Sequence, residues 1–154
     1  MAHQPRMQNP AGSVKAQAAG LMLIRITVGI YLLFMGIGKA RWLLDSTPLA
    51  NQLSLWSAQA TPLSRWYLER ILPGTPVFAR LVPLGEMAGG LALAVGFWTR
   101  LVAGAMFLMI LNYQLAAGAI FSYAYLTNAN GLPLLGSLLG LMLGGGRLPL
   151  SIRK

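Results

Sequence analysis

The sequence has no cysteine and a single histidine, His3, among its 154 residues. The lack of cysteine excludes disulfides, thiol relays, CxxCH haem attachment and cysteine-ligated iron–sulfur clusters within this chain. One histidine cannot supply paired haem ligands, and without thiols beside it no zinc or copper site can be assembled. We therefore expect no haem, iron–sulfur or metal ligands in this chain. Any redox role has to borrow its electron carrier from a quinone or a partner protein.

Acidic residues are also scarce, since three Asp and Glu stand against 12 Lys and Arg and the formal net charge is +9. Such an excess of positive charge suits either nucleic acid or anionic lipid headgroups. Hydrophobic residues, however, make up 56% of the chain, and the mean hydropathy is +0.61. A composition this apolar is typical of a membrane protein. We therefore expect membrane lipids, and no nucleic acid, among the partners.

Long apolar runs are plentiful, and four of them reach or approach the roughly 20 helical residues that cross a hydrocarbon core of about 30 Å. The first is interpreted as a retained helix rather than a cleaved signal peptide, because it contains Arg25 and no small-residue cleavage site follows it. The predicted spans are residues 19–38, 77–97, 101–121 and 131–147.

These spans predict an all-α membrane protein, a four-transmembrane-helix bundle with an amphipathic helical segment between the first two helices. The predicted organisation has three parts: a flexible N-terminal tail at 1–17, the four-helix membrane domain at 18–147 and a basic C-terminal tail at 148–154. The distribution of Lys and Arg in the short loops predicts that both termini are cytoplasmic, in the cytoplasmic (inner) membrane. The basic segment 39–80 would then lie outside. Because it is long, its Lys and Arg residues count less in the positive-inside rule, which applies mainly to short loops.

Thr-Pro recurs at 47/48, 61/62 and 75/76, which predicts three helix starts with threonine as N-cap and proline in the first helical position. The first two helices would be amphipathic, with Trp56 and Trp66 among their apolar faces. Tryptophan beside arginine suits the headgroup level of a membrane. Two interpretations stay open: a cap over the mouth of the bundle, or a connector that only rests on the lipid.

Arg25 and Glu86 are the two charged residues well inside the predicted spans, since Arg80 and Arg147 stand at span ends. A charge at mid-bilayer costs at least about 2.5 kcal/mol, so such residues normally face the protein interior and find a partner. The predicted span boundaries separate the two residues by about 7 Å along the membrane normal, within reach of an arginine side chain. We predict that they pair. The pair is then either a static contact between two helices or part of a polar site for a quinone headgroup, a proton or another polar ligand.

Further polar residues lie near the same level. Asn112 and Gln114 are about 200° apart on a helix, so at most one of them faces the same interior as Glu86. Lys39 either anchors the end of the first helix or binds an anion. Glycines at intervals of four in the second and fourth helices predict close helix packing, namely Gly85, Gly89, Gly136, Gly140 and Gly144.

Three stretches carry a family resemblance: RITVGIYLLFMGIGKARW, RWYLERILPGTPVFARLVPLGEMAGGLALAVGFWTR and LNYQLAAG. In this order they resemble the DoxX/DoxD family of four-helix membrane proteins over about residues 20–146, and the DoxD branch, the membrane subunit of thiosulfate:quinone oxidoreductase, looks closest. The resemblance implies a bundle in the cytoplasmic membrane linked to quinone and sulfur-compound oxidation. The residues at the family's polar positions are Arg25, Lys39, Glu86 and Arg100.

Two functional hypotheses follow. The first is a membrane subunit of a quinone-linked oxidoreductase, which binds quinone while a membrane or periplasmic partner subunit supplies electrons. Its reacting residues would be Glu86 and Arg25, and its ligand-binding residues Arg25, Lys39, Glu86, Arg100, Asn112 and Gln114. The second is a non-catalytic accessory or assembly subunit of a larger respiratory or photosynthetic complex. A small transporter is the third and weakest, because no internal repeat is visible.

Overall fold

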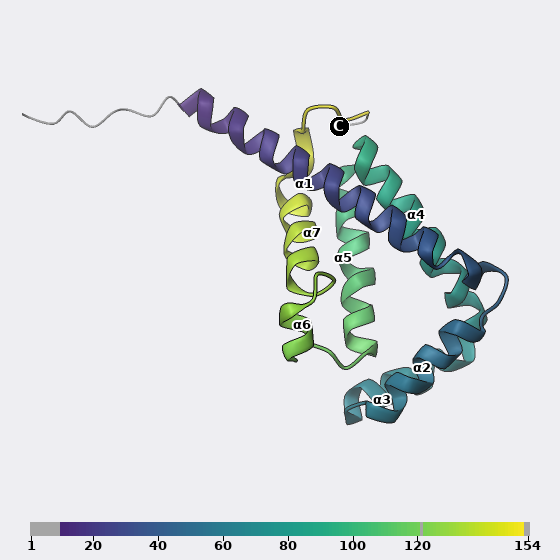
Figure 1. Cartoon of the computed structure of the whole chain (residues 1–154). Helices are drawn as coiled ribbons and strands as arrows, with labels where there is room; N and C mark the ends of the chain where they lie inside the picture. Colours follow the sequence, from purple (N-terminus) through teal and green to yellow (C-terminus); the bar gives the residue numbers. More distant parts are fainter. Residues whose placement is uncertain (1–9, 121, 153–154) are drawn as a thin grey trace, which may run out of the picture.

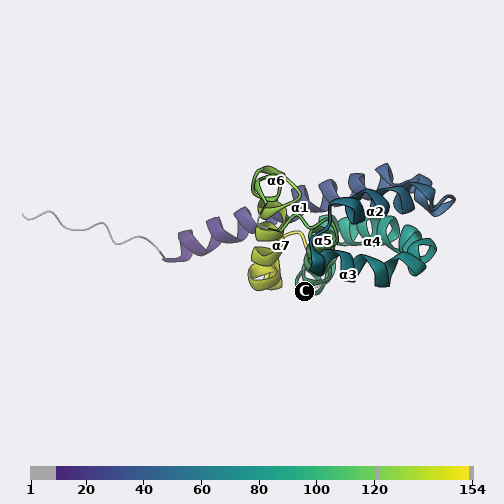
Figure 2. The ribbon, with the colours of Figure 1, turned by 90° about the horizontal axis from the view of Figure 1, so that it is seen from below.

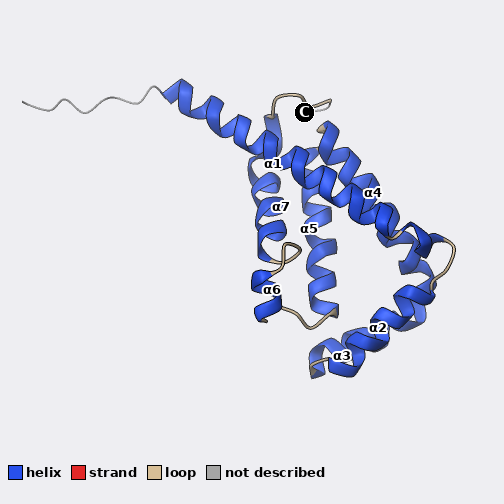
Figure 3. Cartoon of the chain, in the orientation of Figure 1, coloured by secondary structure: helices blue, strands red, loops and turns tan. Residues whose placement is uncertain are grey.

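The structure is a computed structural model that describes residues 10–120 and 122–152. Within these residues all regular structure is helical and no strand occurs (Figure 3), which confirms the predicted all-α fold. The elements, in chain order, are α1 Pro10–Gly38, η1 Ala40–Leu43, α2 Thr47–Gln59, α3 Pro62–Ile71, η2 Leu72–Gly74, α4 Thr75–Val95, α5 Thr99–Ala116, α6 Tyr123–Thr127, α7 Leu132–Gly144 and η3 Gly145–Arg147.

Three helical stretches are long and apolar enough to cross a membrane: Gly12–Gly38, Pro62–Val95, which contains α4, and Thr99–Ala116. The fourth apolar helix, α7, has only 13 residues and a length of about 20 Å. It is shorter than the span predicted at 131–147 because Pro133 stands in its first turn and glycines follow from Gly144. The bundle therefore has three full-length helices and one short one.

Two predicted boundaries differ from the structure. Helix α1 already begins at Pro10, so part of the predicted N-terminal tail is helical, and residues 1–9 lie outside the described residues. At the other end, Leu148 is buried and the amide of Ile152 donates to the Val95 carbonyl at 3.3 Å. The start of the predicted C-terminal tail is therefore attached to the bundle, because Leu148 contributes to the main core, although Leu150 and Ile152 remain exposed. Residues 153–154 lie outside the described residues.

Helices α1 and α4 run side by side over much of their length (Figures 1 and 2) and form the most extensive helix contact in the described chain. A Cβ atom on Gly29 would lie 2.5 Å from the Ala94 nitrogen, and one on Gly90 would collide with the Leu33 nitrogen. The two backbones thus approach as closely as glycine allows. Elsewhere in the described chain, an added Cβ on Gly136 or Gly140 would meet no atom within 4 Å, so their predicted packing role is wrong.

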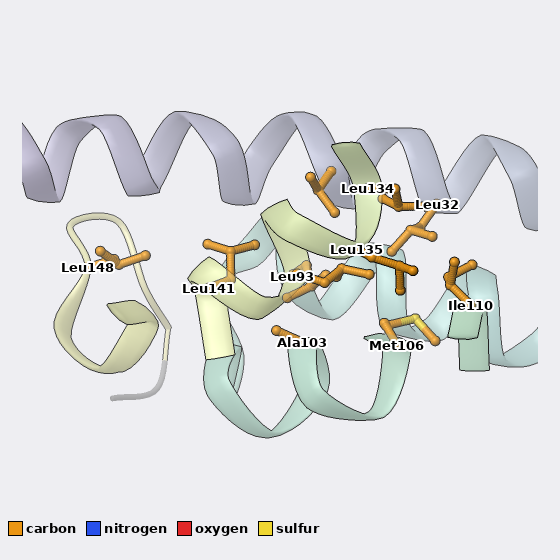
Figure 4. Packing of buried hydrophobic residues seen from close by; sticks show 11 residues of the cluster. Leu32, Leu93, Ala103, Met106, Ile110, Leu134, Leu135, Leu141 and Leu148 are labelled. Carbon is orange, nitrogen blue, oxygen red and sulfur yellow. The ribbon is translucent and has the colours of Figure 1, made fainter. Parts of the chain in front are cut away.

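The buried side chains form two clusters. The larger joins α1, α4, α5 and α7 (Figure 4), and Leu32, Leu93 and Leu141 in it are fully buried. The smaller lies where α2 and α3 meet α4 and α5, and consists of Leu49, Leu53, Leu68, Ala79 and Ala116. Because the second cluster buries residues of α2 and α3 against the bundle, these two helices, called the cap from here on, are more than a connector lying on lipid.

The Thr-Pro pairs mark all three helix starts, and threonine acts as the N-cap only once. The Thr61 hydroxyl accepts a bond from the Ser64 amide at the start of α3. At α2 the carboxylate of Asp45 accepts from the Thr47 amide at 2.9 Å, and bonding to Thr47 lowers the pKa of Asp45. At α4 the Thr75 hydroxyl instead donates to the Leu72 carbonyl at 2.6 Å.

Candidate functional site

A polar cavity of about 340 Å³ lies between the cap, the ends of α1 and α5 and the segment before α7. Ligand sites typically occupy about 300–1,000 Å³ and combine apolar walls with a few polar groups. The cavity is lined by Met35, Lys39, Trp42, Gln52, Trp56, Glu86, Ile110, Tyr113, Gln114, Ala117, Asn128 and Asn130.

The centre of the polar cavity is an ion pair between Lys39 and Glu86. Lys39 Nζ lies 2.5 Å from Glu86 Oε1. The Glu86 side chain is fully buried, whereas the Lys39 side chain keeps 19% of its surface exposed. The second carboxylate oxygen, Oε2, is buried and has no hydrogen-bond partner among the described residues. The cavity therefore contains a buried acceptor with unused capacity.

The predicted pairing of Arg25 with Glu86 is wrong. Arg25 is fully buried, and its Nη1 donates to Ser151 Oγ at 2.6 Å while Nη2 donates to the Leu150 carbonyl at 2.9 Å. A Cβ on Gly96, which has φ +74°, would collide with the guanidinium. Arg25 thus lies where α4 ends and the C-terminal segment returns, away from the polar cavity.

The helix register explains the difference. Gly29 packs against Ala94, and Gly36 packs against Met87, so α1 and α4 run antiparallel. This register brings Glu86 opposite the last two turns of α1, close to Lys39, which follows the end of that helix. Arg25 lies about ten residues earlier, roughly 15 Å away along the helix. The predicted span boundaries placed the two charges at similar depth because they were estimated for each helix separately, without the register between α1 and α4.

Aromatic side chains form the walls around the ion pair. The Tyr113 hydroxyl is buried and has no hydrogen-bond partner in the described part of the chain. Lys39 Nζ lies 5.4 Å from the centre of the Tyr113 ring and 5.9 Å from that of Trp42. Trp56 of the cap meets Tyr113 edge to face, with ring centres 5.8 Å apart. The ammonium is therefore held over aromatic faces as well as by the carboxylate.

Amide side chains complete the lining on the side toward α7. Gln114 Nε2 donates to the Asn130 carbonyl at 3.0 Å, and the Tyr31 hydroxyl donates to Asn130 Oδ1. These bonds fix the segment before α7 against α5 and α1. Asn128 and Gln52 add further amides to the lining. The cavity thus presents several neutral donors and acceptors around one ion pair.

Of the six predicted binding residues, the structure brings Lys39, Glu86 and Gln114 together in the polar cavity. The other three lie elsewhere: Arg25 at the C-terminal segment, Arg100 with its Nε donating to the Met142 carbonyl, and Asn112 accepting from the Tyr67 hydroxyl. Asn112 and Gln114 do point to different places, as their spacing predicted.

The lining residues that sequence reasoning did not assign to the site include three aromatic ones, Trp42, Trp56 and Tyr113. Tyr113 stands between Asn112 and Gln114, so a polar stretch inside a predicted span was the available signal. The described residues contain no group of three His, Cys, Asp or Glu side chains that could hold a metal ion.

The helices and this cavity define a helical membrane protein with several long apolar helices and a polar site beneath a cap. A family model described as DoxX matches residues 20–119, more than half of the chain, and the protein belongs to the DoxX family. Searches among curated proteins and among solved structures found no match. The matched region includes Lys39, Glu86 and Gln114, and the narrower resemblance to the DoxD branch stays a prediction.

Proposed function

We propose that this protein is the membrane subunit of a quinone-linked oxidoreductase complex and binds the quinone headgroup in the polar cavity. The observation that carries the proposal is the pair of unused buried oxygens, Glu86 Oε2 and the Tyr113 hydroxyl, beside Lys39. Buried polar atoms are almost always paired, and an unpaired one costs about 1–3 kcal/mol. A quinone carbonyl can accept a hydrogen bond from the Tyr113 hydroxyl, and a hydroxyl of the quinol can donate one to Glu86 Oε2, so the two atoms favour a quinone–quinol ligand.

A quinone headgroup suits the chemistry of this lining. Its flat ring has apolar faces that pack against Trp42, Trp56 and Tyr113. Its two carbonyl oxygens accept hydrogen bonds, for which Lys39 Nζ and the Tyr113 hydroxyl are the donors. Gln114 donates to the Asn130 carbonyl and thereby holds the segment before α7 in place at the edge of the cavity.

Reduction of a bound quinone to the quinol consumes two electrons and two protons. The electrons come from a redox cofactor of a partner subunit that oxidises thiosulfate or another donor. The Tyr113 hydroxyl and the Lys39 ammonium donate one proton each to the two carbonyl oxygens. Two protons taken up from water restore these donors, and the Glu86 carboxylate, which is bonded to Lys39, accepts one of them and passes it to the Lys39 amine. Arg25, expected from the sequence to share this work, has no role in it because it lies at the C-terminal segment.

The topology assigned to this function has both termini in the cytoplasm and the cap on the outer face of the cytoplasmic membrane. In support, the C-terminal segment reaches Arg25 and Val95 at the end of the bundle opposite the cap (Figure 1). The partner subunit would then be periplasmic or a second membrane protein, and lipid surrounds the remaining apolar faces.

The test compares two carboxylate-to-amide substitutions. Glu86→Gln removes the buried carboxylate, whereas Glu69→Gln makes the same change on the exposed face of α3. Each protein is purified in mild detergent and its quinone binding is measured by extraction and by titration. We expect Glu86→Gln to lose affinity by about tenfold or more, because the amide no longer holds the Lys39 ammonium in place as a donor to the quinone, and one buried polar contact is worth about 1–3 kcal/mol. Equal binding by both variants, or none by the wild type, contradicts the proposal.

The alternative of an accessory or assembly subunit has one observation in its favour. The first half of α1 projects beyond the bundle (Figure 1), and Val14 and Leu23 in it are 63% and 59% exposed. Such an apolar helix suits contact with another membrane subunit. Purification with large cofactor-bearing subunits but no quinone bound in this chain would favour this alternative over the first.

A further inference from the structure

We infer that the ligand of the polar cavity carries an apolar tail, and that the first carbons of this tail lie in a second, apolar pocket next to the headgroup. The inference rests on the proposed function and narrows it to lipid-soluble, tailed quinones. The second pocket has a volume of about 50 Å³ and lies where the cap meets α4 and α5. It is called the side pocket below.

The side pocket and the polar cavity adjoin each other. Trp56 and Tyr113 line both spaces. Their rings meet edge to face at 86°, so one aromatic pair forms the boundary between the two spaces. A headgroup that lies against Tyr113 in the polar cavity is therefore next to the side pocket, on the other side of this pair, where its substituent would be placed.

The two spaces differ sharply in polarity. Apart from the shared pair, the side pocket is bounded mainly by aliphatic and aromatic side chains, including Leu53, Phe78 and Ala116. Its other polar side chains, Tyr67 and Asn112, bond to each other. A polar substituent would therefore find few free partners there, whereas methylene or isoprenoid carbons match the lining.

Charge distinguishes a tailed quinone from other amphiphiles with a single chain. A fatty acid would bring its carboxylate next to the buried carboxylate of Glu86, and like charges at short range disfavour binding. A quinone is neutral and offers only acceptors toward Lys39 and the Tyr113 hydroxyl. A neutral head with an apolar tail is thus the ligand that both spaces favour.

The experiment uses an Ala→Leu substitution at each of two neighbouring positions, one to narrow the side pocket and the other to narrow the polar cavity. Ala116→Leu fills part of the side pocket, and Ala117→Leu fills part of the polar cavity. The probes are decylubiquinone and the same dimethoxy-methyl-benzoquinone without its side chain. We expect Ala116→Leu to weaken decylubiquinone by at least about tenfold and to leave the tail-less quinone unchanged, since one misfitting methylene has an effect of this size. Ala117→Leu should weaken both probes.

A second variant and a second readout keep the test decisive. Val82→Phe also narrows the side pocket and replaces Ala116→Leu if that variant unfolds. A decyl quinone with a photoreactive group near the start of its tail should label the segments around Leu53 and Val82. Tail-independent binding, or labelling only outside these segments, overturns the inference while headgroup binding still supports the proposed function. Failure of the wild type to bind either probe overturns the proposed function itself.

Discussion

The two ends of the α1–α4 pair each bury one charged side chain completely, and they treat it differently. At one end Arg25 is held by the Ser151 hydroxyl and the Leu150 carbonyl of the C-terminal segment. At the other end Glu86 meets the ammonium of Lys39 and borders a cavity of about 340 Å³. Both solutions offset the cost of burying charge. Arg25 Nε, like Glu86 Oε2, is buried without a partner among the described residues, but the Lys39 end is the one that borders the polar cavity. The proposed ligand site therefore lies at the Lys39 end.

The largest expected effect comes from breaking the helix contact that fixes both ends. Gly90→Leu would drive a side chain into the backbone of α1 at Leu33, where even a Cβ collides. We expect a loss of about 3 kcal/mol or more in the free energy of unfolding, at the upper end for overpacked sites. Denaturation in mild detergent measures this loss. The matched control is Gly136→Leu, at which an added Cβ meets nothing within 4 Å in the described chain.

The next largest effect is expected when one partner of the ion pair between Lys39 and Glu86 is removed. Lys39→Met leaves the Glu86 carboxylate buried without its ammonium, which should cost about 2 kcal/mol of stability, less than for a fully buried pair because Lys39 is 19% exposed. Combining it with Glu86→Gln should restore most of the stability without restoring quinone binding. A double variant as unstable as Lys39→Met alone would contradict the pairing.

A smaller effect is expected at the opposite end. Ser151→Ala removes one hydrogen bond from the Arg25 guanidinium, and a bond to a charged group contributes about 1.5 kcal/mol. Thermal denaturation should report this loss, and quinone affinity should not change. An altered affinity would show that the two ends are coupled, and the comparison above would have to be revised.

The smallest expected change in stability comes from removing the Tyr113 hydroxyl, which should nevertheless lower quinone affinity. Tyr113→Phe removes a hydroxyl that has no partner among the described residues, so stability should stay the same or rise by about 1 kcal/mol. Quinone affinity should fall by about fivefold, because a donor to the ligand is lost. Tyr123→Phe is the control, because Tyr123 is 82% exposed and lines neither pocket, and it should change neither stability nor affinity.

Much of the fold could be predicted from the sequence because its signals are local. Hydropathy located the long helices, and Thr-Pro pairs located the starts of α2, α3 and α4. The spacing of Asn112 and Gln114 indicated that only one of them reaches the interior near Glu86, and the structure selects Gln114. These features depend on a few neighbouring residues and on helix periodicity.

The partner of Glu86 could not be predicted in the same way. It depends on the register between α1 and α4, which is set by close approach at Gly29, Gly36 and Gly90. Estimated span boundaries carry errors of several residues, and each residue shifts a side chain by 1.5 Å along the helix. Because Lys39 ends an apolar run, the sequence left open whether it anchors the helix end or binds an anion, and its contact with Glu86 emerges only from packing.

The most direct test uses the absence of cysteine, since any cysteine introduced into the chain is the only one. Gln52→Cys places a thiol in the lining of the polar cavity, whereas Ser54→Cys lies on the exposed side of the same helix. With decylubiquinone at ten times its Kd, we predict that maleimide labelling of Gln52→Cys slows by about tenfold and that labelling of Ser54→Cys is unchanged. Equal labelling rates with and without quinone at position 52 would contradict the assignment of this cavity as the ligand site.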